Sequence, residues 1–64
     1  MAANNRLKAA RVLVGLTQLQ LAEMVGTKEI EISRIETGRS EPHLPLKEKI
    51  AAVLEKPTFE LFVG

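Results

Sequence analysis

The polar side chains between residues 17 and 39 carry the most informative chemistry in this sequence. Arg34 has a planar guanidinium, which can donate two parallel hydrogen bonds to O6 and N7 of guanine. Lys28 and Arg39 can each contact a phosphate group. The free backbone amides of a helix that starts near Gln18 are also good phosphate donors. These residue types predict contacts with a nucleic acid.

Acidic and apolar residues stand among these cations and leave a second interpretation open. Glu29 and Glu31 can accept a hydrogen bond from the amino group of cytosine, but a carboxylate otherwise repels phosphate. They can equally form a solvated helix face. Ile30 can touch a thymine methyl group or be half-buried. Acids at these positions favour a protein-binding surface over a DNA-binding one.

The sequence offers little for catalysis. It has 64 residues, no cysteine and a single histidine, His43, which we interpret as a loop residue without a chemical role. It has no paired carboxylates in a plausible pocket, and so short a chain leaves little room for a cleft. We therefore expect no enzyme, metal, cofactor or small-molecule substrate.

Charge and hydropathy place further bounds on function. The net charge is only +1, but the first sixteen residues hold Arg6, Lys8 and Arg11 and no acid, so a basic first helix could face phosphates. No apolar run approaches the length of a membrane span, and the N-terminus does not resemble a signal peptide. We expect a soluble, cytoplasmic protein without membrane contacts.

Breakers divide the chain into helical segments. Glycine and proline separate apolar-periodic stretches, and strand signals are nearly absent. Thr17 and Gln20 have the spacing of a capping box, which marks a helix start. We predict a single domain over residues 1–64 in the all-α class, a compact bundle of five short helices. They are expected at about residues 5–14, 18–25, 28–37, 45–55 and 58–62.

The second and third of these helices predict a helix-turn-helix with its core at residues 17–38. Ala22 is small enough for the site where the two helices cross, and Gly26 tolerates the positive φ of the turn. Ile32 and Ile35 are branched apolar anchors for the third helix. The outer face of that helix is then free to enter the major groove of double-stranded DNA.

The sequence resembles the Cro/C1-type helix-turn-helix regulators, also called the Xre family, over about residues 7–62. The resemblance is carried by GLTQLQLAEMVG at residues 15–26 and ISRIETG at residues 32–38. It extends to Pro42, Ile50, Ala51, Leu54 and the segment 60–62. The resemblance implies the lambda repressor-like DNA-binding fold. Glu55 departs from the pattern, because the family usually has glycine after the fourth helix.

The resemblance also implies roles for individual residues. Thr17 and Gln18 match positions that contact a phosphate and sometimes a base edge. Thr37 and Arg39 match positions that contact the DNA backbone. The outward positions of the recognition helix correspond to Lys28, Glu29, Ile30 and Arg34.

One further pair implied by the resemblance joins two helices. Arg11 matches an arginine of the first helix that pairs with the glutamate at Glu36, which would clamp the first helix to the third. The pair can be purely structural. If it is only partly buried, it can also orient Arg11 towards a phosphate.

These features favour a transcriptional regulator, a repressor of phage or bacterial type. A homodimer on a two-fold operator would place its recognition helices roughly 34 Å apart. Two alternatives stay open: a protein-binding module of the same fold, such as an antitoxin or coactivator, and a DNA-binding domain of a longer regulator. Apolar residues outside the expected core are either scattered surface residues or a contact for a second copy: Val12, Leu13, Leu19 and Met24. The segment 59–63 is another candidate for dimerisation.

Overall fold

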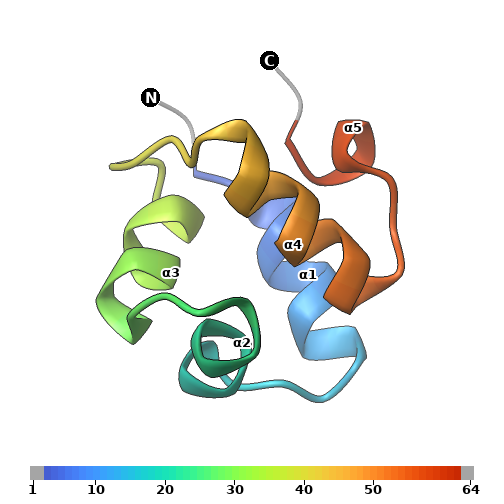
Figure 1. Ribbon diagram of the computed structural model, residues 1–64, viewed down its shortest axis with the longest axis horizontal. Coiled ribbons are helices and arrows are strands. Elements are labelled where there is room, and N and C mark those ends of the chain that lie inside the picture. Colours follow the sequence, from blue (N-terminus) through green and yellow to red (C-terminus); the bar gives the residue numbers. More distant parts are fainter. Residues whose placement is uncertain (1–2, 63–64) are drawn as a thin grey trace.

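The computed structural model describes residues 3–62, and every regular element within this range is a helix. The elements are α1 (Asn5–Leu13), α2 (Gln18–Val25), α3 (Glu29–Glu36), α4 (Leu44–Leu54) and α5 (Thr58–Leu61). Figure 1 shows the five helices folded into one bundle. The predicted all-α class and the number of helices are confirmed.

The bounds of α2 follow from its capping residues, as predicted. The Thr17 hydroxyl accepts a hydrogen bond from the amide of Gln20 at 3.0 Å, and the Gln20 side chain accepts one from the amide of Thr17 at 2.9 Å. At the other end Gly26 has a φ of 77°, in the left-handed region. This conformation strains a residue that has a Cβ atom, so glycine ends the helix there.

The bounds of α1 and α3 differ slightly from the prediction. Asn4 caps α1, which ends at Leu13, one residue earlier than expected. Val14 therefore lies outside the helix and is 52% exposed. Lys28 is the N-cap of α3 but makes no side-chain capping bond, and the helix begins at Glu29.

A histidine sets the start of α4. Nδ1 of His43 accepts a hydrogen bond from the amide of Leu46 at 3.2 Å, so α4 begins at Leu44 rather than at Pro45. His43 lies in the loop before α4, as interpreted, and its ring has a structural role that the sequence did not suggest, because it satisfies a free amide of the first turn. At the other end Glu55 adopts φ 55°, the left-handed conformation for which the family pattern has glycine.

Each helix contributes one large side chain that is essentially inaccessible to solvent. These five residues are Leu7, Leu21, Ile32, Ile50 and Leu61. Smaller and partly buried apolar residues surround them in a single cluster. Since every helix supplies part of the same core, the helices depend on one another for stability.

Asn4 connects distant parts of the chain. Its Oδ1 accepts from the amide of Leu7 at 3.0 Å, and its Nδ2 donates to the carbonyl oxygen of Leu61 at 2.7 Å. Its own amide donates to the carbonyl oxygen of Glu36 at 2.9 Å. One residue thus joins the start of α1 to the ends of α3 and α5.

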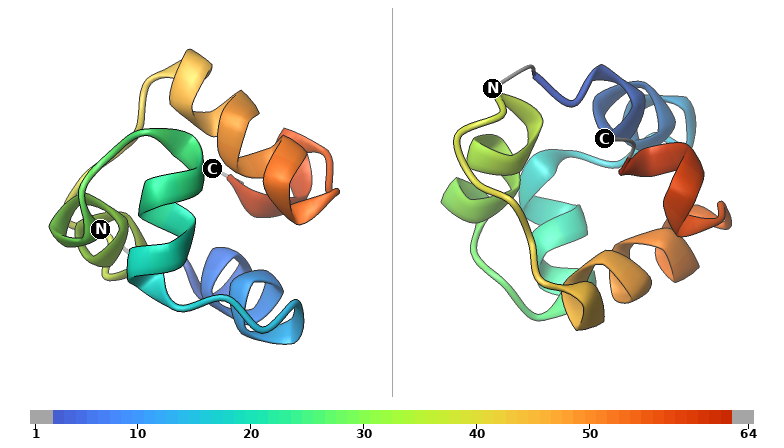
Figure 2. Two further views of the ribbon diagram at one scale, coloured as in Figure 1. Left: turned by 60° about the horizontal axis from the view of Figure 1, so that its bottom comes forward. Right: turned by 90° about the horizontal axis from the view of Figure 1, so that it is seen from above.

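The position of α3 matters most for the site. It packs chiefly against α2 and lies at one side of the bundle, opposite α5 (Figures 1 and 2). Its outer face is therefore not covered by another helix. Within residues 3–62 no helix has the length and apolar character needed to cross a membrane.

Candidate nucleic-acid interface

The scaffold beneath α3 consists of the residues predicted for it. Ala22, Ile32 and Ile35 are all buried between α2 and the helices around it. The turn between α2 and α3 begins at Gly26, and the amide of Thr27 donates to the carbonyl oxygen of Ala22 at 2.9 Å. A Cβ atom at Gly26 would meet no atom within 4 Å, so the need for glycine comes from its φ and not from crowding. These contacts hold α3 at a fixed angle on α2.

The exposed side of α3 carries residues of three chemical types. Ile30 is 56% exposed, and Arg34 lies one helical turn further on, also exposed. Glu29 is exposed at the start of the helix, next to the N-cap residue Lys28. An apolar group, a donor and an acceptor thus stand on the solvent side, where all three can reach a ligand.

The two acidic residues of the first turn of α3 have different surroundings. Glu31 is half-buried, and its carboxylate accepts a hydrogen bond from the Ser40 hydroxyl at 2.6 Å. Its charge is therefore turned towards the loop after α3. Glu29 is exposed, and within residues 3–62 it has no ion pair. Sequence reasoning missed Ser40, because its distance of nine residues from Glu31 matches no helical spacing.

Three cations and one hydroxyl surround this face. Lys28, Arg34 and Arg39 are exposed, and none of them forms an ion pair with another described residue. Their charges are free to meet an anion. Thr37 is exposed, but its hydroxyl donates to the carbonyl oxygen of Ser33 at 2.9 Å. Donation from Thr37 to a phosphate would require this hydroxyl to change partner.

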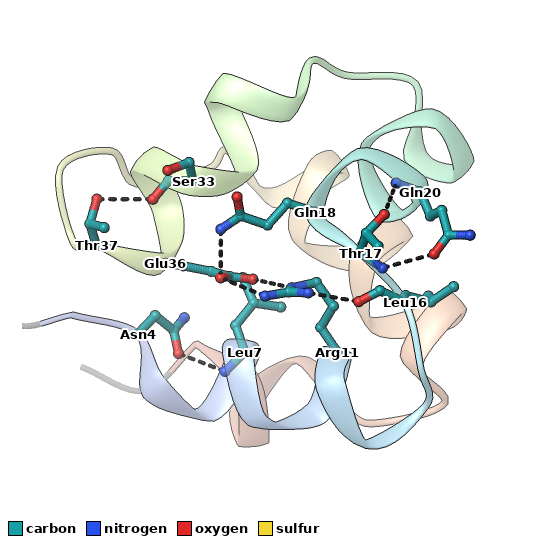
Figure 3. Close-up of polar contacts among 10 residues, drawn as sticks. All are labelled: Asn4, Leu7, Arg11, Leu16, Thr17, Gln18, Gln20, Ser33, Glu36 and Thr37. Carbon is teal, nitrogen blue, oxygen red and sulfur yellow. Dashed lines mark hydrogen bonds and ion pairs between the residues drawn. The ribbon is translucent and has the colours of Figure 1, made fainter.

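The start of α2 lies close to α3. Thr17 is exposed and Gln18 is half-buried. The amide nitrogen of the Gln18 side chain donates to Oε1 of Glu36, at the end of α3, at 3.0 Å (Figure 3). The first residues of α2 and the recognition helix are therefore joined through side chains.

Arg11 and Glu36 form the ion pair that the family resemblance implied. Nε of Arg11 lies 2.6 Å from Oε2 of Glu36, and its second terminal nitrogen lies 3.2 Å from Oε1. The remaining nitrogen donates to the carbonyl oxygen of Leu16 at 2.6 Å. Arg11 is only 8% exposed, so it belongs to the scaffold, and the phosphate contact expected from it does not fit its burial.

The sequence and the fold are both similar to those of known proteins. A family model described as helix-turn-helix matches residues 7–61. Among the 14 chains of solved structures that match is the restriction-modification controller protein C.AhdI from Aeromonas hydrophila. It is 30% identical, with a TM-score of 0.85, over 92% of this chain and 89% of that one. No curated protein matches at a significant level.

Proposed function

Because the chain belongs to the Cro/C1-type helix-turn-helix family and is a sequence-specific DNA-binding regulator, we propose that it reads the major groove with Glu29, Ile30 and Arg34. The observation that carries this proposal is the solvent-facing side of α3. Within residues 3–62, this side presents a guanidinium without an ion pair one turn from an exposed apolar side chain, on a face that no other helix covers. Arg34 would recognise guanine, Ile30 a thymine methyl group, and Glu29 the amino group of cytosine.

A second set of residues would fix the protein on the DNA backbone. Lys28 and Arg39, exposed at the two ends of α3, would each contact a phosphate. Thr17 uses its hydroxyl oxygen to accept from Gln20, so the hydroxyl proton is still free for a phosphate. Thr37 would join them after a change of hydroxyl partner. We assign no DNA contact to Arg11.

We further propose that the protein acts as a homodimeric repressor of bacterial type, in the cytoplasm, and that residues 1–64 form a single domain without a catalytic role. The similarity to a restriction-modification controller supports a bacterial regulator. A dimer is supported by exposed apolar side chains outside the DNA-reading face. They include Val12, Leu13, Leu19, Met24 and Phe59. Two copies would place their α3 helices roughly 34 Å apart, which is one turn of the duplex.

The alternative is a protein-binding module of the same fold, for which the acids on α3 were the main argument. Glu31 is turned to Ser40, so Glu29 alone gives the exposed face of α3 a negative charge. Against it stand Lys28, Arg34 and Arg39, three exposed cations that have no ion pair with any described residue. This balance favours an anionic ligand.

The test is binding of the purified protein to double-stranded DNA over a salt series, followed by selection of bound duplexes from a random pool. We expect the logarithm of the binding constant to fall linearly as the logarithm of the salt concentration rises. We also expect the selection to enrich a sequence with two-fold symmetry. Absence of binding even at low salt would exclude the proposal. Enrichment of an unsymmetric sequence would exclude the dimer alone.

A further inference from the structure

Within the described part of the chain, the Glu36 carboxylate accepts hydrogen bonds from two side chains, of which one is its ion-pair partner. The carboxylate accepts from Arg11 through both oxygens, and Oε1 also accepts from Nε2 of Gln18 at 3.0 Å. The side chain of Glu36 is 3% exposed, whereas Gln18 is half-buried at the start of α2. Figure 3 shows the Glu36 carboxylate hydrogen-bonded to both the Gln18 amide and the Arg11 guanidinium, between α1, α2 and α3. The buried Glu36 carboxylate thus holds the amide of Gln18, a side chain that reaches the surface.

The chemistry of this contact determines which way the Gln18 amide faces. A carboxylate paired with a guanidinium can only accept hydrogen bonds, so it is the nitrogen of the Gln18 amide that must face Glu36. The carbonyl oxygen then points away from Glu36, as Figure 3 shows. No hydrogen bond reaches this oxygen from residues 3–62, and within this range every buried side-chain nitrogen or oxygen has a partner. The Gln18 oxygen is therefore accessible to solvent.

An outward carbonyl oxygen selects among the groups that DNA presents. It can accept from the amino group of adenine or cytosine, but it cannot bond a phosphate oxygen, because both atoms are acceptors. The Gln18 nitrogen has a second proton, so the amide can also donate. Glutamine that accepts from N6 and donates to N7 is the pairing that recognises adenine in the major groove.

Resting on the proposed DNA binding, we propose that Glu36 is a positioning residue for base readout. It holds the Gln18 amide in the one orientation that presents an acceptor to a base amino group, and Arg11 holds Glu36 in turn. Gln18 is then a specificity residue that reads adenine beside the bases read by α3. Since its amide is already ordered, Gln18 loses less side-chain freedom on binding than an unrestrained glutamine would.

The experiment compares base preference among variants by selection from a random duplex pool, with thermal unfolding measured in parallel. For Gln18→Ala we expect the preference at one base pair of each half-site to fall by roughly 5- to 150-fold, with the salt dependence unchanged. For Glu36→Gln we expect the preference at the same base pair to fall as well. The new amide at position 36 can face Gln18 with either its oxygen or its nitrogen, so it no longer fixes the orientation of the Gln18 amide. Arg34→Ala is the matched control, since it should lower the preference at a different base pair.

Glu36→Asp covers the case in which Glu36→Gln fails to fold. It keeps a carboxylate for Arg11 but shortens the reach to Gln18, so it should also lower the preference at the base pair that Gln18 reads. If Gln18→Ala weakens binding equally for all sequences and lowers the salt slope by about one, Gln18 contacts a phosphate and the proposal is wrong. If the folded Glu36 variants lose stability but keep the full preference at that base pair, Glu36 is only structural. Either result leaves DNA binding itself intact, whereas failure of the proposed function would abolish binding of the unmodified protein.

Discussion

The guanidinium of Arg11 and the carboxylate of Glu36 meet through two hydrogen bonds, 2.6 and 3.2 Å long, inside the protein. A third bond joins the same guanidinium to the carbonyl oxygen of Leu16, in the segment between α1 and α2. One side chain of α1 thus contacts both the end of α3 and the segment that leads into α2. Both charged groups have hydrogen-bond partners in the interior. The loss of stability on substitution therefore depends on whether one charge or both charges are removed.

Arg11→Met should be strongly destabilising. It leaves the buried carboxylate of Glu36 without its cation, and loss of one partner of a buried pair typically costs about 3–5 kcal/mol. Urea denaturation followed by circular dichroism would measure the change in the free energy of unfolding. The matched control is Arg11→Met combined with Glu36→Met, which removes both charges and should recover most of the loss. A loss below about 1 kcal/mol for the single variant would contradict a buried, charged pair.

Arg34 and Lys28 should differ in what they contribute to DNA binding. Arg34→Ala should lower the preference for one base pair by about 1–3 kcal/mol, because the bidentate contact to guanine is lost. Lys28→Ala should weaken binding to all sequences and reduce the salt slope by about one. Measured affinities for matched and mismatched duplexes at several salt concentrations separate the two effects. Lys49→Ala, at an exposed position on α4 outside the proposed contacts, serves as the control.

Substitution by glutamine should change the DNA sequence preference at Glu29 but not at Glu31. Glu29→Gln replaces an acceptor for cytosine by a group that suits adenine, so the selected sequence should change at one base pair from C towards A. Glu31→Gln should leave the sequence preference unchanged, since this side chain faces Ser40. Selection from a random duplex pool checks both variants. If instead Glu31→Gln changed the preferred sequence, the assignment of Glu31 to the loop contact would be wrong.

Glu55→Gly should stabilise the protein. Glu55 adopts φ 55°, and a residue with a Cβ atom in this conformation is disfavoured by roughly 1–2 kcal/mol relative to glycine. Part of this gain is offset by the greater freedom of glycine in the unfolded chain, so we expect a net gain of about 0.5–1 kcal/mol. Thermal denaturation should show a rise in Tm of a few degrees. Glu48→Gly, at an exposed site inside α4, is the control and should lower Tm.

Much of the fold could be predicted because its signals are local. The capping box of Thr17 and Gln20 gave the start of α2, and Gly26 gave its end. The spacing of Ile32 and Ile35 predicted correctly which side of α3 is buried. The sequence did not reveal a helix start that is set by an unusual capping residue. His43 takes a capping role more often filled by serine or aspartate, and so α4 begins one residue earlier than expected.

The site was predictable only in part, because its arrangement depends on distant contacts. The family resemblance implied that Arg34 and Lys28 face outward, and both are exposed. The engagement of Glu31 with Ser40 depends on the path of the loop after α3. The burial of Arg11 and the orientation of Gln18 both depend on the place where α1, α2 and α3 meet. No spacing in the sequence encodes that meeting point.

The two hydrogen bonds of the Asn4 side chain have a consequence for how the protein opens. The same amide caps the first turn of α1 and holds the last carbonyl oxygen of α5. Fraying of α5 would leave the amide without one of its partners, and a strained or rotated amide would weaken the cap of α1. The first and last helices are therefore coupled in a single cooperative unit, and their amide protons should exchange with solvent at similar free energies of opening.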